Sequence, residues 1–255
     1  MTKYISILFI FFLGFDKSFA QENKLPTNFS EYCLYADTQD PIKTQQYLKY
    51  DFSNALIPEK GEYYQFLGII GRQYQRLYIV FDNIVKDKND PRIYWVNGHS
   101  KVKENKNDFS GKIIVEKIYA SESEPVLATD LVVEDISKAG VTVFAKYEFF
   151  EDKNQKFSGR FKGEMWLSGY INMKDNFVYG GSHEVCPSYR NNQYVGSWQE
   201  YKTSKIKIAN WGQHQIPGVS ERDDPTGGGT SCGGFGVDPK YYSRGWSEKE
   251  QPPKC

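Results

Sequence analysis

The sequence predicts an all-β protein whose strands form a single antiparallel β-barrel or strongly curved sheet of calycin-like architecture. Three observations predict this class. Residues 157–171 alternate between apolar and polar side chains without a break, which is the period of a strand with one buried face. Other short segments are rich in aromatic and β-branched residues and are separated by turn residues. Residues 62–211 contain no Pro-, Gly- or Ser-rich linker, so we expect one barrel domain over this range.

The first twenty residues have the features of a secretory signal peptide. Lys3 precedes an apolar run from Ile5 to Phe15, and small residues lead up to a cleavage point after Ala20. The alternative is a membrane anchor, but this run of eleven residues is little more than half of the roughly 20 that a spanning helix needs. We therefore expect a secreted or periplasmic protein that is not inserted in a membrane after cleavage.

All four cysteines follow the expected cleavage point, where an oxidising compartment allows them to pair. We expect two disulfides among Cys33, Cys186, Cys232 and Cys255. Of the three possible pairings we favour Cys33–Cys186 with Cys232–Cys255, because the second bond would fix the C-terminal tail. The alternative is a zinc site that adds His183 and His214. The long gap between His214 and Cys232 is unlike that of zinc ligands, so we expect neither a metal nor another cofactor.

Residues 21–61 are expected to form an N-terminal segment with one short helix. Asp40 is a suitable N-cap residue, and Pro41 is tolerated at the first helical position. The helix would then run from Ile42 to Tyr50.

Nine strands are expected, and most are joined by short turns as antiparallel hairpins. In the most regular strand, residues 157–171, Phe161 and Met165 share the apolar face with three glycines. Glycine inside a strand often marks the close approach of another segment, which we expect here. The other strands are expected at residues 62–70, 74–84, 92–103, 109–119, 131–136, 141–149, 194–201 and 204–211. The turns are expected at residues 71–72, 87–90, 104–108, 138–140 and 152–154.

Residues 212–255 are expected to form an irregular tail packed on the barrel, because 14 of these 44 residues are Gly or Pro. Phe235–Tyr242 could add a last edge strand. An acidic cluster of Glu221, Asp223 and Asp224 lacks the spacing of an EF-hand calcium loop. We interpret it as a solvated turn.

The charges of the chain balance. There are 32 basic and 32 acidic side chains, so the formal net charge is zero. This balance provides no overall attraction to nucleic acid or to an anionic membrane, and we expect no nucleic-acid partner.

The tripeptide Gly196-Ser197-Trp198 resembles the Gly-x-Trp motif of lipocalins, and the succession of antiparallel strands is similar to that of the wider calycin barrels. The resemblance covers three residues, and it lies late in the chain, whereas lipocalins carry the motif in their first strand. It implies a barrel and carries over no functional residue.

Exposed aromatic side chains beside basic ones are the candidates for a binding site, because Trp and Tyr suit the recognition of sugars, peptides and protein partners. No nucleophile elbow of the form Gly-x-Ser-x-Gly occurs. We therefore predict a monomeric, non-catalytic binding protein that uses an aromatic and basic surface, or the barrel mouth, to hold a small molecule or an extracellular protein. One such partner would be an enzyme that it inhibits. The predicted ligand-binding residues are Arg160, Trp166, Tyr170, Trp198 and Trp211.

The alternative is a secreted hydrolase that acts on glycans or peptides. Such an enzyme would use a pair of carboxylates, which the sequence does not identify among its many acidic residues. Glu164 and Glu200 are the candidates. Two facing carboxyl groups in a deep pocket would favour the hydrolase, and a pocket with apolar and aromatic walls would favour a binding protein.

Overall fold

The computed structural model describes residues 25–29, 41–58, 66–121, 137–180, 190–213, 215–220, 223–226 and 237–247. The predicted signal peptide, all four cysteines, His183, His214 and the strand predicted at residues 131–136 lie outside the described residues.

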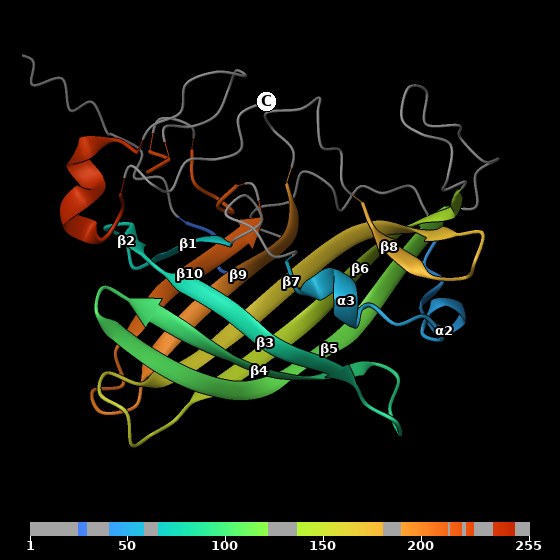
Figure 1. The fold of residues 1–255 in the computed structure, drawn as a ribbon, viewed down its shortest axis with the longest axis horizontal. Coiled ribbons are helices and arrows are strands. Elements are labelled where there is room, and N and C mark those ends of the chain that lie inside the picture. Colours follow the sequence, from blue (N-terminus) through green and yellow to red (C-terminus); the bar gives the residue numbers. More distant parts are fainter. Residues whose placement is uncertain are drawn as a thin grey trace, which may run out of the picture.

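One antiparallel sheet dominates the fold and curls strongly into a half-barrel, which confirms the predicted class (Figure 1). The spatial order is β2-β1-β10-β9-β7-β6-β5-β4-β3, with β8 paired to β7. The strands are β1 (Leu67–Ile70), β2 (Gln75–Arg76), β3 (Tyr78–Lys86), β4 (Ile93–Val102), β5 (Asn105–Ser121), β6 (Ser137–Glu151), β7 (Gly159–Asn172), β8 (Phe177–Tyr179), β9 (Asn191–Glu200) and β10 (Ile206–Gln213).

The two ends of this sheet meet at one corner. The first strand in the spatial order, β2, and the last, β3, are separated in sequence only by Leu77. The Leu77 amide donates a 2.9 Å hydrogen bond to the carbonyl of Gly68 in β1. The buried Arg76 guanidinium reinforces the corner by donating to the carbonyl oxygens of Leu77, at 2.5 Å, and Phe66, at 3.2 Å. The sheet is therefore closed at this corner.

The alternation predicted in residues 157–171 is the one that fills the core. Phe161, Met165 and Leu167 of β7 are each no more than 1% exposed, whereas Lys162 faces solvent. The predicted close approach occurs at Gly163, where a Cβ atom would lie 2.1 Å from the carbonyl oxygen of Val195. Glycine is required there because backbone atoms of β9 occupy the space of a side chain.

Aromatic rings occupy the centre of the half-barrel. Tyr194 stacks on Trp211 with their ring centroids 5.0 Å apart, and Tyr147 meets Trp211 edge-on at 5.1 Å. Phe149 stacks on Tyr147 at 5.1 Å and on Phe109 at the same distance. These rings bury large apolar areas in contact geometries that aromatic pairs favour.

The N-terminal segment packs against the core with two short helices, α2 (Thr44–Tyr47) and α3 (Ser53–Leu56), instead of the single helix predicted over residues 42–50. Phe52 lies between them and meets Phe177 at a centroid distance of 4.8 Å. Lys86 holds the segment by donating to the carbonyl oxygens of Leu48 and Tyr50 at 2.6 and 2.5 Å. The predicted helix does not form at its start because Ile42 forms a bridge to Tyr119 of β5.

Several predicted boundaries are wrong for local reasons. The turn predicted at residues 138–140 lies within β6, where Gly140 continues the ladder opposite Tyr170. The β4–β5 hairpin turns at Lys103 and Glu104 alone, because pairing resumes at Asn105. The strand predicted from Phe157 starts at Gly159, since Phe157 has φ of +52°, which strands do not adopt.

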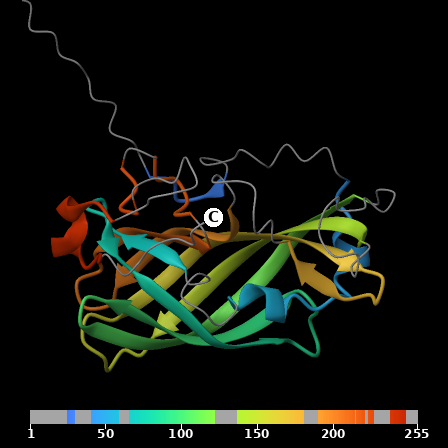
Figure 2. The ribbon, with the colours of Figure 1, turned by 45° about the horizontal axis from the view of Figure 1, so that its top comes forward.

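The C-terminal tail contains a 3₁₀-helix, η2 (Pro239–Arg244), where an edge strand was predicted. Asp238 caps it by accepting a 3.0 Å hydrogen bond from the Lys240 amide, and Pro239 stands at the first helical position. Trp246 then packs with Leu25 and Ile69 in a small cluster that is separate from the main core. The η2 helix itself lies beside β2 at one end of the sheet (Figure 2). No helix within the described ranges is long and apolar enough to cross a bilayer.

Candidate functional site

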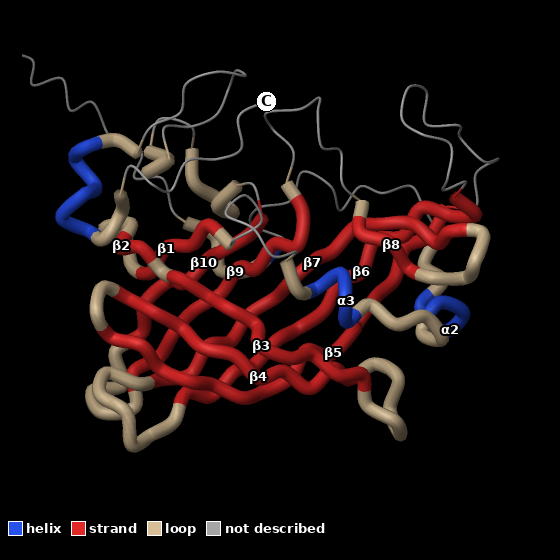
Figure 3. Tube along the Cα trace, in the orientation of Figure 1, coloured by secondary structure: helices blue, strands red, loops and turns tan. Residues whose placement is uncertain are grey.

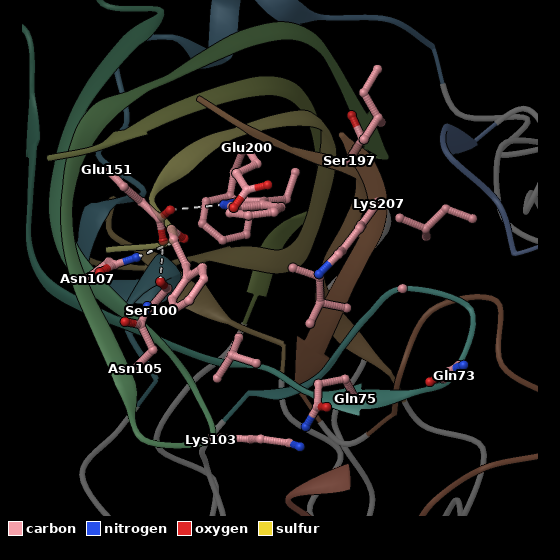
Figure 4. Close-up of a pocket in the computed structure, with 18 of the residues that line it drawn as sticks. Gln73, Gln75, Ser100, Lys103, Asn105, Asn107, Glu151, Ser197, Glu200 and Lys207 are labelled. Atoms are coloured by element: carbon pink, nitrogen blue, oxygen red, sulfur yellow. Dashed lines mark hydrogen bonds between the residues drawn. The ribbon is translucent and has the colours of Figure 1, made fainter. Parts of the chain in front are cut away.

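A pocket of about 820 Å³ opens at one end of the half-barrel, where three hairpins turn (Figure 4). The tips of the β4–β5, β6–β7 and β9–β10 hairpins contribute Lys103, Phe157 and Ile206, and the β1–β2 turn contributes Arg72. The volume lies within the range of roughly 300–1,000 Å³ that is typical of small-molecule sites. We call this cavity the barrel-end pocket.

Strand alternation explains which side chains enter the pocket. In β6 the inward face runs through Tyr147 and Phe149 and continues to Glu151. In β10 the residues that share one face are Trp211, Ala209 and, at the pocket end, Lys207. The inner face of the sheet therefore changes from apolar to polar toward this end. The remaining inner wall is formed by Ile70, Ser100, Val102, Asn107, Phe161 and Trp198.

Glu151 of β6 is a buried carboxylate, only 4% exposed, whose hydrogen bonds reach β4, β7 and β9. Its Oε1 accepts a hydrogen bond from the Ser100 hydroxyl of β4. Its Oε2 accepts from the Gly159 amide of β7 at 2.6 Å and from Nε1 of Trp198 in β9 at 2.9 Å. Both oxygens are thus engaged by donors from the protein itself.

Burial raises the pKa of Glu151 above its ordinary value of 4.5, because the charged form loses hydration. Hydrogen bonds from Ser100, Trp198, Gly159 and Asn107 oppose this shift without cancelling it. The carboxylate fixes the edge of the Trp198 indole and so sets the orientation of the main aromatic wall of the pocket.

Lys207 covers the face of that same indole. Lys207 and Trp198 are cross-strand partners, and the ammonium nitrogen lies 5.4 Å from the ring centroid, as in a cation–π contact. Within the described part of the chain, no carboxylate forms an ion pair with Lys207. Its charge is therefore available to a molecule in the pocket.

Two exposed apolar side chains stand at the rim of the pocket. Phe157 is 70% exposed and Ile206 is 68% exposed. Asn107 holds the unusual left-handed backbone of Phe157, because its side-chain amide donates to the carbonyl oxygens of Lys156 and Phe157, each at 3.3 Å. A strained, bulky residue kept in this position often marks a functional surface.

The structure brings only one of the five predicted ligand-binding residues, Trp198, to the barrel-end pocket. Arg160 faces the outside of β7, where it donates to Glu148 at 3.4 Å and to Gln199 at 3.1 Å. Trp211 lies wholly within the core.

The other two predicted residues, Trp166 and Tyr170, lie on the outer face of β7. Trp166 is 8% exposed and clusters with Phe29 and Val195, so it does not form the exposed aromatic surface that the sequence suggested. Tyr170 is half-buried beside Val178 of β8.

Sequence reasoning missed Glu151, Ser100, Asn107 and Lys207. The signal for Glu151 was present in the sequence, because it continues the inward alternation of residues 141–149 by one step. A charged residue at an expected inward position marks either the end of a strand or a buried polar site, and here it marks both.

The two carboxylates considered for hydrolysis lie in different places. Glu164 is on the outer face, where it accepts a 2.9 Å hydrogen bond from the Phe29 amide and lines a second pocket of about 380 Å³. Glu200 lines the barrel-end pocket and accepts a hydrogen bond from the Thr203 hydroxyl. The two do not face each other in one pocket.

The described residues contain no group of three potential metal ligands. In the predicted acidic turn, Asp224 accepts hydrogen bonds from the amide and hydroxyl of Thr226 at 2.8 and 2.6 Å. Burial raises the pKa of Asp224. Asp223 accepts from the Ser220 hydroxyl, so both carboxylates hold the local turn together.

Fold and site together define a class: an antiparallel half-barrel protein with a ligand-sized pocket at one end. Comparisons with protein-family models, curated proteins and solved structures give no match.

Proposed function

We propose that this chain is a non-catalytic binding protein that holds a small molecule in the barrel-end pocket. The observation that carries the proposal is the placement of Trp198 in the wall of a ligand-sized cavity, with its edge held by Glu151 and its face beneath Lys207. Apolar walls with a few placed polar groups are typical of ligand pockets.

The pocket favours a ligand with an apolar or aromatic body and an acidic substituent. Phe161, Val102 and Ile70 offer apolar surface next to Trp198. Lys207 provides an ammonium group above the ring, and a ligand that displaces it from the indole face can pair with it through a carboxylate or a phosphate.

The state of Glu151 supports binding over hydrolysis. A general acid or nucleophile must present a carboxyl oxygen to the substrate, whereas both oxygens of Glu151 accept hydrogen bonds from the protein. Glu200, the candidate from the sequence, and Glu104 are then the carboxylates that remain on the pocket wall for the alternative hydrolase. Glycan or peptide hydrolysis that is abolished in Glu200→Gln would support this alternative against our proposal.

Export and disulfide formation are part of the proposal, and they rest on the sequence of the first twenty residues and on the four cysteines. Intact-mass measurement of the protein from the exported fraction should show loss of residues 1–20 and of four hydrogens. Alkylation of free thiols in that fraction would contradict the disulfides, but it would leave the proposal of pocket binding unaffected.

The test of pocket binding is native mass spectrometry of the protein purified from its exported fraction, followed by titration of the identified ligand. Trp198→Ala should weaken capture at least about tenfold, as expected when an aromatic anchor is lost. The control is Trp95→Ala, which removes a 48% exposed tryptophan from the outer face of β4. Equal binding by the two variants would contradict the proposal. Lys207→Ala provides a second test at an exposed position, where folding is not at risk.

A further inference from the structure

The three hairpin tips around the barrel-end pocket lie together at one end of the half-barrel (Figure 3). The Tyr201 amide of the β9–β10 turn donates to the carbonyl of Ser158 in the β6–β7 loop at 3.0 Å. The Asp152 amide donates to the carbonyl of Asp108 in β5 at 3.1 Å, and the Asp108 amide donates to Gln155 Oε1 at 2.9 Å. These bonds hold the three tips in a fixed arrangement.

This surface is basic although the whole chain has a net charge of zero. The three tips carry fewer carboxylates than lysines. Glu104, Asp108 and Asp152 are exposed, Glu200 is half-buried, and Glu151 is buried and hydrogen-bonded. We define the basic rim as the exposed lysines of the three tips, which are Lys101, Lys103, Lys106, Lys153, Lys156, Lys202, Lys205 and Lys207. Across the described ranges none of these lysines forms an ion pair.

Apolar side chains project from the same surface. Phe157 and Ile206, on adjacent tips, are among the most exposed large apolar residues described, and both line the mouth of the pocket. The combination of exposed apolar groups with a surrounding ring of lysines is typical of surfaces that bind the interface of an anionic bilayer.

We propose that the basic rim docks on the surface of an anionic lipid bilayer. The lysines pair with lipid phosphates, while Phe157 and Ile206 enter the headgroup region. A bilayer suits this surface better than nucleic acid does, because an aliphatic Ile206 offers no flat face for base stacking and gains most from an apolar medium. Such docking is peripheral, and it brings the mouth of the barrel-end pocket against the lipid. It does not depend on the proposed pocket ligand.

The test is co-sedimentation of the full mature chain with vesicles. We expect binding to vesicles of equimolar phosphatidylglycerol and phosphatidylcholine, a marked loss of binding as salt is raised, and little binding to phosphatidylcholine alone. The paired variants Phe157→Ser/Ile206→Ser and Lys202→Glu/Lys205→Glu should each weaken binding about tenfold or more. All four positions are exposed, so these variants should keep their fold, as monitored by circular dichroism.

Matched controls lie at the other end of the half-barrel. Ile42→Ser/Met173→Ser removes two side chains of 57% and 60% exposure. Lys88→Glu/Lys174→Glu reverses two exposed lysines on the β3–β4 and β7–β8 turns. Both control pairs should bind vesicles as the wild type does.

Three results would overturn the docking proposal. The first is no binding to anionic vesicles at low salt. The second is equal loss of binding in the rim and control pairs. The third is binding of a DNA oligonucleotide or of polyglutamate that is as strong as vesicle binding. This result counts if that binding requires Lys202 and Lys205 but not Phe157 and Ile206. The pocket proposal would survive each result, because Trp198→Ala tests it separately.

Discussion

The indole nitrogen of Trp198 donates a 2.9 Å hydrogen bond to the buried carboxylate of Glu151, and this bond joins β9 to β6 across the intervening β7. The same carboxylate oxygen also accepts from the Gly159 amide of β7. One acidic group thereby holds three neighbouring strands at the end where the pocket opens, and it orients the aromatic wall of that pocket.

The ionisation of Glu151 should make the stability of the fold depend on pH. Because its pKa is raised in the folded protein, its ionisation disfavours folding. Its contribution to the free energy of unfolding is greatest below about pH 4.5, the ordinary value for this group, and declines as pH rises through the raised pKa. Glu151→Gln should remove this decline, since an amide can accept from Gly159 and Trp198 and donate to Ser100. Urea unfolding at a series of pH values measures both profiles.

Glu151→Ala provides the contrast. It leaves the donors of Ser100, Gly159 and Trp198 without their acceptor, so it should lower the free energy of unfolding by about 1–3 kcal/mol throughout the pH range. If the Gln variant kept the wild-type decline with rising pH, the assignment of that decline to Glu151 would be wrong.

Gly163→Val should destabilise the fold by about 1–3 kcal/mol, because its new Cβ would lie 2.1 Å from the Val195 carbonyl oxygen, which belongs to the backbone and cannot move freely. Gly140→Val in β6 is the matched control, since a Cβ there meets no atom within 4 Å. Urea unfolding compares the two. Similar midpoints for both variants would mean that β7 and β9 do not approach as closely as described.

Phe157→Gly should raise the free energy of unfolding by about 1 kcal/mol, because glycine adopts a φ of +52° without strain. The measurement is a thermal or urea melt, with Lys156→Gly as the neighbouring control at a position without positive φ. A loss of stability in Phe157→Gly would show that the exposed ring makes stabilising contacts. The same variant should weaken vesicle binding.

Trp166→Ala should cost about 3 kcal/mol of stability, as expected for a large buried aromatic side chain. The ring packs with Phe29 and Val195 on the outer face of the sheet. Because this cluster is remote from the inner wall of the pocket, the folded variant should keep wild-type affinity for the pocket ligand. A stable variant with weakened binding would instead support the ligand-binding role that the sequence predicted for Trp166.

The sequence predicts this fold well where burial depends on strand alternation alone. Phe161 and Met165 are inward because every second residue of β7 points to the core, and this pattern is visible without the structure. Gly140 was misleading, since glycine usually marks a turn but here occupies a strand with open space beside it. The short β8 strand has no sequence pattern long enough to predict it.

The candidate site was harder to predict because it depends on contacts between distant segments. Trp166 has the period of a solvent-facing residue, but it is buried in an outer-face cluster to which the N-terminal segment contributes Phe29. The left-handed backbone of Phe157 is held by Asn107, which comes from another hairpin. Neither contact leaves a trace in the local sequence.

The order of strands also bears on how the chain reaches its native state. Most neighbours in the sheet are joined by hairpins, but β1 pairs with β10, so Gly68 lies opposite Trp211. Non-local pairings of this kind form slowly, because the entropy of a long loop must be lost before the contact is made. When the chain is synthesised from its N-terminus, β1 therefore lacks its partner until β10, the last strand of the sheet, has also been made.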